Sequence, residues 1–305
     1  MARWGGSRFQ SRTKHVKLEP EVARRRSATC ARLFYMFRIP RPVGMLAFVA
    51  AWLIPWRSHY RVQTSDPKLS FIVHRRDGIG RHIAKYGAHE PGVTAWIAHH
   101  LKGSPPGIFV DVGANIGWHA IHAARHVSVE TVVAFEPEPL NTLLLDQNVS
   151  INNIGKVVIC SCALGASSGL ARLHRYKDSN RGRHSLIRDY GFGSRLVPLR
   201  ELDRELSSLG LSERPILVLK IDVEGFEPAV IEGASQALTR TKAVVLEFSP
   251  GLSREGGLSI HAMIDQLQRS GFKPYSLANG RLEPIEREWL AGFDGQLDVI
   301  WTRQT

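Results

Sequence analysis

The sequence Phe109-Val110-Asp111-Val112-Gly113-Ala114-Asn115-Ile116-Gly117 joins an apolar run at 108–112 to a helix-compatible segment at 118–125. The apolar run is typical of a buried strand, and the small residues after it indicate a tight turn. The spacing is D-x-G-x-x-x-G, which differs from the G-x-G-x-x-G of a dinucleotide-binding turn. Because glycines let the backbone approach a ligand closely, we expect a ligand site here. A corner that serves packing only is the alternative.

Apolar runs and helical segments alternate on both sides of this turn, from about residue 70 onward. Strands are expected at 71–73, 108–112, 131–135, 157–162, 216–221, 243–248 and 297–301, and helices within 83–101 and at 118–126, 140–152, 228–232 and 260–270. This alternation predicts an α/β fold with a doubly wound, mainly parallel sheet. A polar, Gly-rich stretch at 170–199, with two short strand candidates, interrupts it. We expect substrate contacts from that stretch.

Ligands bind at the carboxyl ends of the strands in such sheets, so these ends locate candidate site residues. The second strand ends at Glu136, whose carboxylate can accept hydrogen bonds from both hydroxyls of a ribose. A helix N-terminal acid stabilised by the dipole is the alternative. The third strand ends at Cys162 and Ala163, whose small side chains leave room for a flat base, or serve packing only. Glu247 ends the fifth strand, either as a wall of the pocket or as a capping acid.

The fourth strand carries alternating charges, Lys220, Asp222 and Glu224. While the strand persists these side chains share one face. Three charges at the end of a buried strand are costly unless they are paired or used. We interpret them as catalytic, and a structural ion-pair cluster is the alternative.

Together these motifs resemble the FkbM family of S-adenosylmethionine (SAM)-dependent methyltransferases, over roughly residues 76–248. The resemblance rests on Val110–Gly117, Ala134–Pro137, Ala163–Gly165, Leu202-Asp203, Lys220–Glu227, Gly233 and Leu238. Upstream, Gly87–Pro91 is similar to the first segment of the family, with His89 where an aromatic residue is usual. The resemblance implies a seven-stranded, Rossmann-like sheet of the class I methyltransferase type. It also implies O-methylation of a hydroxyl on a sugar, polyketide or other small metabolite.

The resemblance further suggests roles for individual residues. Cofactor-binding residues are expected at Glu90, Asp111, Gly113, Ala114, Asn115, Gly117, Glu136, Cys162 and Ala163. Asp222 or Glu224 is the expected general base, with Lys220 offsetting one carboxylate. These two acids are also oxygen donors for a hard cation, but no third ligand is evident, so no metal is predicted. His119 and His122 are interpreted as packing or surface residues.

The net charge of +12 is unevenly distributed along the 305 residues. Residues 1–42 hold eleven Lys or Arg against two acids, so they carry nine of the twelve net charges. The high isoelectric point therefore reflects an N-terminal extension, and nucleic-acid binding is not expected. An RNA methyltransferase and a catalytically silent SAM-fold module remain as alternatives. Three cysteines form no metal-binding spacing.

The first 60 or so residues lie outside the resemblance. Residues 1–42 are expected to be a basic, disordered tail, and 43–69 an apolar element with a linker before the domain at 70–305. The apolar stretch at 43–54 is shorter than the roughly 20 residues that span a bilayer. An interfacial element, a packed helix, a signal-like remnant and a start downstream of Met1 all remain open. We expect a cytoplasmic protein with peripheral membrane contact through 43–56. Its acceptor and oligomeric state are not encoded in these patterns.

Overall fold

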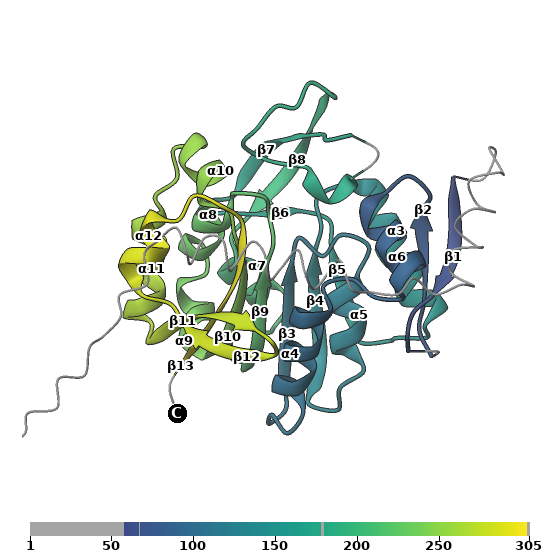
Figure 1. Cartoon of the computed structure of the whole chain (residues 1–305), viewed down its shortest axis with the longest axis horizontal. Coiled ribbons are helices and arrows are strands. Elements are labelled where there is room, and N and C mark those ends of the chain that lie inside the picture. The colour runs from purple at the N-terminus through teal and green to yellow at the C-terminus, as the bar shows by residue number, and fades with distance from the viewer. Residues whose placement is uncertain (1–57, 67, 178–179, 304–305) are drawn as a thin grey trace, which may run out of the picture. The chain divides into compact units, whose positions relative to one another are not determined.

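The computed structural model describes residues 58–66, 68–177 and 180–303, which form an α/β fold around one large sheet (Figure 1). The sheet has eight strands in the order β12-β11-β13-β10-β9-β3-β4-β5. Its parallel strands are β5 (Val157–Cys160), β4 (Val129–Phe135), β3 (Gly107–Val112), β9 (Ile216–Ile221) and β10 (Thr241–Phe248). Antiparallel pairing adds β13 (Leu297–Arg303), β11 (Phe272–Ala278) and β12 (Arg281–Pro284). The expected doubly wound, mainly parallel sheet is confirmed, and β12 extends it beyond seven strands.

Helices cover both faces of the sheet because successive side chains of a buried strand point to opposite sides. In β3, Val110 packs into one layer and Phe109 into the other, and both are fully buried. Burial of each such side chain contributes roughly 1.5–3 kcal/mol to the stability of the fold. The Val110 layer contains α7 (Leu202–Ser208), α8 (Glu227–Glu232), α9 (Ser235–Arg240), α11 (Ile260–Arg269) and α12 (Arg287–Gly292). The Phe109 layer contains α4 (Pro91–Leu101), α5 (Trp118–Ala124) and α6 (Pro139–Ile151).

Two smaller sheets and several short helices extend this core. The hairpin of β1 (His59–Gln63) and β2 (Ser70–His74) lies against α6, where Asn148 Oδ1 accepts a hydrogen bond from the backbone N of Ile72 at 2.6 Å. The interruption at 170–199 forms β7 (Gly169–His174), the short helix η1 (Arg181–Arg183) and β8 (Ser194–Arg200), which pairs with β6 (Ala163–Leu164). The remaining helices are α3 (Gly78–Tyr86) and α10 (Pro250–Glu255).

The helix expected within 83–101 is α4, and a second helix, α3, precedes it. Gly87 ends α3 with a φ of 72°, and its N–H donates to the carbonyl of Ile83 at 2.7 Å. Glu90 then adopts a φ of 40° immediately before Pro91 opens α4. A non-glycine residue in this left-handed region is strained, and such strain is concentrated at functional sites.

Strand β11 was missing from the sequence-based expectation. Its sequence contains Lys273 and Pro274 and lacks an apolar alternation. Because proline has no backbone N–H, it is rare inside sheets. Pairing with both β12 and β13 nevertheless holds this segment as a strand.

The two glycines of the turn after β3 are both required by the backbone, with φ angles of 79° at Gly113 and 88° at Gly117. A Cβ at Gly113 would collide with the backbone carbonyl of Asp222, so the absence of a side chain lets the ends of β3 and β9 meet. A Cβ at Gly117 would collide with Leu145 of α6. Gly117 therefore fixes the start of α5 against α6.

We expect Gly117→Ala to lower the free energy of unfolding by about 3 kcal/mol, through left-handed strain and overpacking against Leu145. Gly103→Ala is the matched control, because Gly103 has a φ of 89° with no neighbouring atom within 4 Å. Gly103→Ala introduces the left-handed strain without the overpacking, so it should lower the free energy of unfolding by about 1 kcal/mol. Urea denaturation measures both. Equal losses would mean that Leu145 moves aside without cost.

The basic tail at 1–42 and the apolar stretch at 43–56 lie outside the described residues. Within the part of the chain that the structure does describe, no helix combines the length and apolar character needed to cross a bilayer.

Candidate active site

The carboxyl ends of β3, β4, β9 and β10 open into a cleft of about 490 Å³. This volume lies within the range of roughly 300–1,000 Å³ that is usual for small-molecule sites. Eleven of the twelve site residues expected from the sequence line it: Glu90, Asp111, Gly113, Ala114, Asn115, Glu136, Cys162, Ala163, Lys220, Asp222 and Glu224. Gly117 is the exception, and the structure gives it the packing role described above instead of a place in the cleft.

The backbone N–H groups at the start of the glycine turn are directed at the end of β4. The N–H groups of Gly113 and Ala114 both donate to the carbonyl of Phe135, at 2.9 and 3.0 Å. The N–H of Asn115 donates to Glu136 Oε2 at 2.8 Å. These three N–H groups hold the turn against β4, and Gly113, Ala114 and Asn115 line the cleft. That this backbone lines a cofactor stays a prediction.

Glu136 is buried at the end of β4, yet its carboxylate lines the cleft. Its Oε1 accepts hydrogen bonds from the N–H of Glu138 at 2.9 Å and from Asn141 Nδ2 at 3.4 Å. Burial raises the pKa of Glu136 to about 7, although these hydrogen bonds and that of Asn115 oppose the rise. Since each carboxylate oxygen has two acceptor positions, Oε2 keeps capacity for a ligand hydroxyl.

Asp111 is 1% exposed, and neither of its carboxylate oxygens has a hydrogen-bond partner among the described residues. Burial raises the pKa of Asp111 to about 6, against the influence of Lys220. An unpartnered buried carboxylate is costly, and a cationic or hydrogen-bonding ligand would relieve that cost. The third strand, β5, ends at Cys160, two residues earlier than expected, and Cys162 lies between β5 and β6. Burial raises the pKa of the Cys162 thiol to about 12, so this wall of the cleft is uncharged.

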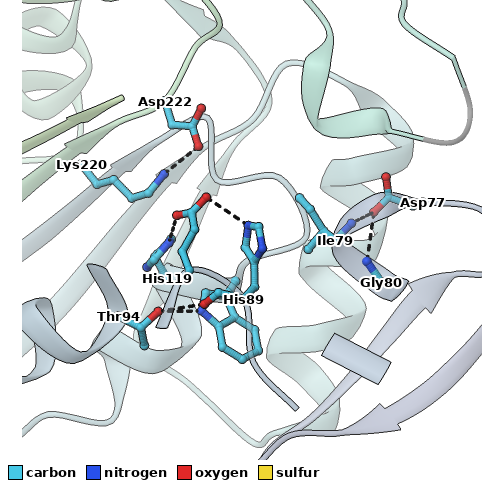
Figure 2. Close-up of polar contacts among 10 residues, drawn as sticks. Asp77, Ile79, Gly80, His89, Thr94, His119, Lys220 and Asp222 are labelled. Atoms are coloured by element: carbon cyan, nitrogen blue, oxygen red, sulfur yellow. Dashed lines mark hydrogen bonds and ion pairs between the residues drawn. The ribbon is translucent and has the colours of Figure 1, made fainter. Parts of the chain in front are cut away.

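Lys220 and Asp222 form an ion pair in which Nζ donates to Oδ2 at 3.1 Å (Figure 2). Burial alone would lower the pKa of Lys220, but the carboxylates of Asp222, Asp111 and Glu90 outweigh it and raise the pKa. The sequence predicts that Lys220, Asp222 and Glu224 share one face while the strand persists. The strand ends at Ile221, before both acids, and Glu224 has a φ of 49°, so Glu224 departs from that face.

The turn carries Glu224 to a different position from Asp222. Its Oε1 lies 3.6 Å from Arg183 Nε, and its buried Oε2 has no hydrogen-bond partner among the described residues. Its backbone carbonyl accepts a hydrogen bond from Ser185 Oγ at 3.2 Å, which fixes the turn. Burial, followed by the charge of Asp222, raises the pKa of Glu224 to about 7 while Arg183 opposes the rise.

Glu90 contacts two imidazoles, those of His89 and His119. Figure 2 labels both histidines and draws their contacts as dashed lines. His119 Nε2 is 2.8 Å from Glu90 Oε2, and His89 Nε2 is 3.2 Å from Oε1. Burial raises the pKa of Glu90 on its own, but the two histidines outweigh it and hold the pKa well below the usual range. Burial lowers the pKa of His119 to about 4, so this imidazole is neutral and its Nε2–H donates to the carboxylate.

His119 was interpreted from the sequence as a packing residue, and the structure corrects this because it lines the cleft. The interpretation holds for His122, whose Nδ1 lies 2.7 Å from the carbonyl of Trp118 and whose ring stacks on Phe71. His119 differs from His122 because α5 packs on the segment at 87–90 and brings His119 to Glu90. The spacing of residues in the sequence does not predict this packing.

We expect His119→Leu to destabilise the protein by about 2 kcal/mol, because the partly buried Glu90 then loses a charge-assisted hydrogen bond. His119→Gln should recover most of the loss, since its amide can donate to the same oxygen. Chemical denaturation at pH 7 measures both variants. A leucine variant at least as stable as the glutamine variant would show that the contact does not stabilise the fold.

The sequence analysis also missed residues around the mouth of the cleft. Arg81 and His82 of α3, and Arg183 and His184 from the 170–199 interruption, line it. Glu247, considered earlier as a wall or a cap, lines it too, and burial raises its pKa well above the usual range. Among the residues that the structure describes, no group of three or more His, Cys, Asp or Glu is arranged to hold a metal ion.

Comparisons with known proteins identify the family. The family model for the methyltransferase FkbM domain matches residues 111–274, more than half of the chain. The hexuronic acid methyltransferase AglP of Haloferax volcanii is 32% identical over 142 residues, which cover 47% of this chain and 56% of AglP. The 31-O-demethyl-FK506 methyltransferase FkbM of Streptomyces tacrolimicus is 28% identical over 180 residues, covering 50% of this chain and 69% of the relative.

A crystal structure of methyltransferase FkbM from Methylobacillus flagellatus aligns with a TM-score of 0.39 and 17% identity, covering 65% of this chain and 43% of that protein. The chain spans 56–60% of the length of three curated relatives that it matches. The family match extends from the aspartate near the end of β3 to β11, so it includes the strand ends that form the cleft, whereas α3, the Glu90 segment and Gln296 lie outside it. The chain therefore belongs to the FkbM methyltransferase family.

Proposed function

We propose that the cleft binds SAM and that the chain transfers its methyl group to a hydroxyl oxygen of a small molecule. The observation that carries the proposal is the meeting of Asp111, Glu136 and Glu224, from three strand ends, in one cleft. The names of the relatives, which include a hexuronic acid methyltransferase and a 31-O-demethyl-FK506 methyltransferase, support a hydroxylated acceptor.

The residues of the cleft fit SAM. Asp111 offers an unpartnered, buried carboxylate to a positively charged ligand group, and Glu136 Oε2 keeps acceptor capacity for a ribose hydroxyl. Cys162 and Ala163 provide a small, uncharged wall for the adenine ring. Glu90, held by His119, supplies a second fixed negative charge.

When bound, SAM supplies a methyl group on a positively charged sulfur, which is already activated for transfer. The protein then has to align the acceptor oxygen, exclude water and remove the hydroxyl proton. We propose that Glu224 Oε2 takes up the hydroxyl proton, because this oxygen is buried and has no hydrogen-bond partner among the described residues. A base whose pKa is raised to about 7 is matched to neutral pH. Asp222 is paired with Lys220, so we assign it the role of a fixed negative charge beside Glu224 and not that of the base.

The test has two steps. Calorimetry with SAM and with S-adenosylhomocysteine measures cofactor binding, and transfer of a labelled methyl group to sugars and other hydroxylated metabolites measures activity. The expected product carries its label on oxygen, which mass spectrometry and NMR identify. A labelled nitrogen or carbon would overturn O-methylation, and absence of SAM binding would overturn the proposal as a whole.

A further inference from the structure

The cleft is electrically polarised between its floor and its rim. The floor, at the strand ends, carries the carboxyl groups of Asp222, Glu224 and Glu247 together with Lys220, which is paired with Asp222. The rim comes from α3 and from the segment that contains η1, and its polar lining residues are Arg81, His82, Asn180, Arg183 and His184. No acidic side chain from these two rim segments lines the cleft in the part of the chain that the structure describes. An acceptor that enters the cleft therefore passes cationic groups before it reaches the base.

Arg183 is the best-defined cation of this rim. Its guanidinium lies over the ring of Tyr176, with Cζ 5.4 Å from the ring centre, and its Nε is 3.6 Å from Glu224 Oε1. The side chain is 40% exposed, and among the described residues its guanidinium donates no hydrogen bond. Tyr176 and Glu224 therefore hold the side chain in place while its N–H groups remain available to a ligand.

The rim segment that contains η1 packs against the glycine turn after β3. A Cβ added to Gly182 would lie 3.1 Å from Asn115 Nδ2 and 3.4 Å from Ile79 Cδ1. The backbone of η1 therefore packs closely on both the glycine turn and α3. This contact sets Arg183 at a fixed place relative to the turn.

We propose that the methyl acceptor is an anionic hydroxylated molecule, whose carboxylate or phosphate binds the rim at Arg183 and Arg81 while its hydroxyl reaches Glu224. The inference rests on the proposed function and adds the substrate class. A guanidinium presents parallel N–H donors that match both anions in two-pronged geometry. On the floor, the one Lys or Arg that lines the cleft among the described residues, Lys220, is already paired with Asp222, so an anionic group is directed to the rim and the hydroxyl points inward.

The test uses matched pairs of probes that differ only in the anion. The protein is first saturated with S-adenosylhomocysteine in the calorimeter, which reports cofactor binding independently. It is then titrated with methyl glucuronide against methyl glucoside, and with glucose 6-phosphate against glucose. We expect at least one anionic probe to bind about tenfold or more tightly than its neutral partner, and the pair that responds distinguishes carboxylate from phosphate.

Substitutions then assign the preference to the rim. Arg183→Gln should reduce it to about threefold or less, and Arg81→Gln should weaken it further. Arg172→Gln is the matched control, because Arg172 is an exposed arginine of β7 that donates to Ser194 Oγ and does not line the cleft. This control should keep the full preference.

Two outcomes overturn the inference while leaving the proposed function standing. One is normal binding of S-adenosylhomocysteine together with equal or absent binding of both members of every pair. The other is an anion preference that persists in both rim variants. Failure to bind S-adenosylhomocysteine is a different result, which overturns the proposed function itself.

Discussion

Replacing Glu224 by glutamine is expected to lower kcat by about 10²–10⁴-fold, the usual contribution of a positioned general base. Glutamine keeps the size of the side chain and the left-handed turn, but it cannot take a proton from the acceptor hydroxyl. The Kd for SAM should stay within about threefold of the wild-type value, because Glu136 and Asp111 are unchanged. Steady-state kinetics with the acceptor found in the transfer screen, together with calorimetry, separates the two quantities.

The pH profile gives a second readout of the same assignment. The pKa of Glu224 is raised to about 7, and only its carboxylate form is a base. At saturating SAM, kcat should rise as the pH increases through about 7 and then level off. The glutamine variant should lose this rise. If Asp222→Asn loses it and Glu224→Gln keeps it, then Asp222 is the base.

Glu227→Gln is the matched control for this experiment. Glu227 is also buried near the end of β9, and burial raises its pKa to about 8, but its side chain does not line the cleft. Its Oε1 accepts a hydrogen bond from the N–H of Gly225 at 2.9 Å, which glutamine can preserve. A large loss of kcat in this variant would show that the turn geometry, and not the base, controls turnover.

The positions of Asp111, Glu136 and Asp222 were predictable from the sequence for one physical reason. Glu136 and Asp222 directly follow an apolar run that forms a parallel strand, Asp111 is the last residue but one of such a strand, and the carboxyl ends of parallel strands gather at one edge. The sequence thus predicted both the main sheet and the acids at its ligand edge. Strand β11 was not predictable in this way, because Pro274 and its polar neighbours become a strand only through pairing with β13.

The environment of each acid required the structure. Strand alternation placed Glu224 beside Asp222, but the turn at Glu224 moves it towards Arg183, a residue 41 positions earlier in the chain. The contact of His119 with Glu90 depends on how α5 packs against the start of α4. Such contacts join distant segments at angles that no residue spacing encodes. The basic rim was missed for the same reason, since its cations come from two segments outside the sheet.

Replacing Glu136 by alanine is expected to weaken SAM binding by about 100-fold, since hydrogen bonds to a charged group contribute about 1.5–3 kcal/mol each. The carboxylate would lose its contact with a ribose hydroxyl, and the N–H of Asn115 would lose the acceptor that holds the glycine turn. Glu136→Gln keeps one oxygen acceptor and should bind SAM with intermediate affinity. Glu138→Gln is the control, because Glu138 is an equally buried neighbour that does not line the cleft.

The pH dependence of SAM binding distinguishes a ligand contact from a purely structural role. Burial raises the pKa of Glu136 to about 7 in the ligand-free protein, so lowering the pH below 7 protonates the acceptor. The Kd for SAM should therefore increase by up to about tenfold per pH unit below 7, and the glutamine variant should lose that slope. Asp111, with a pKa raised to about 6, would contribute only at lower pH. If Glu136→Gln binds SAM as tightly as wild type and keeps the slope, Glu136 only anchors the turn, and the ribose contact belongs to another residue of the cleft.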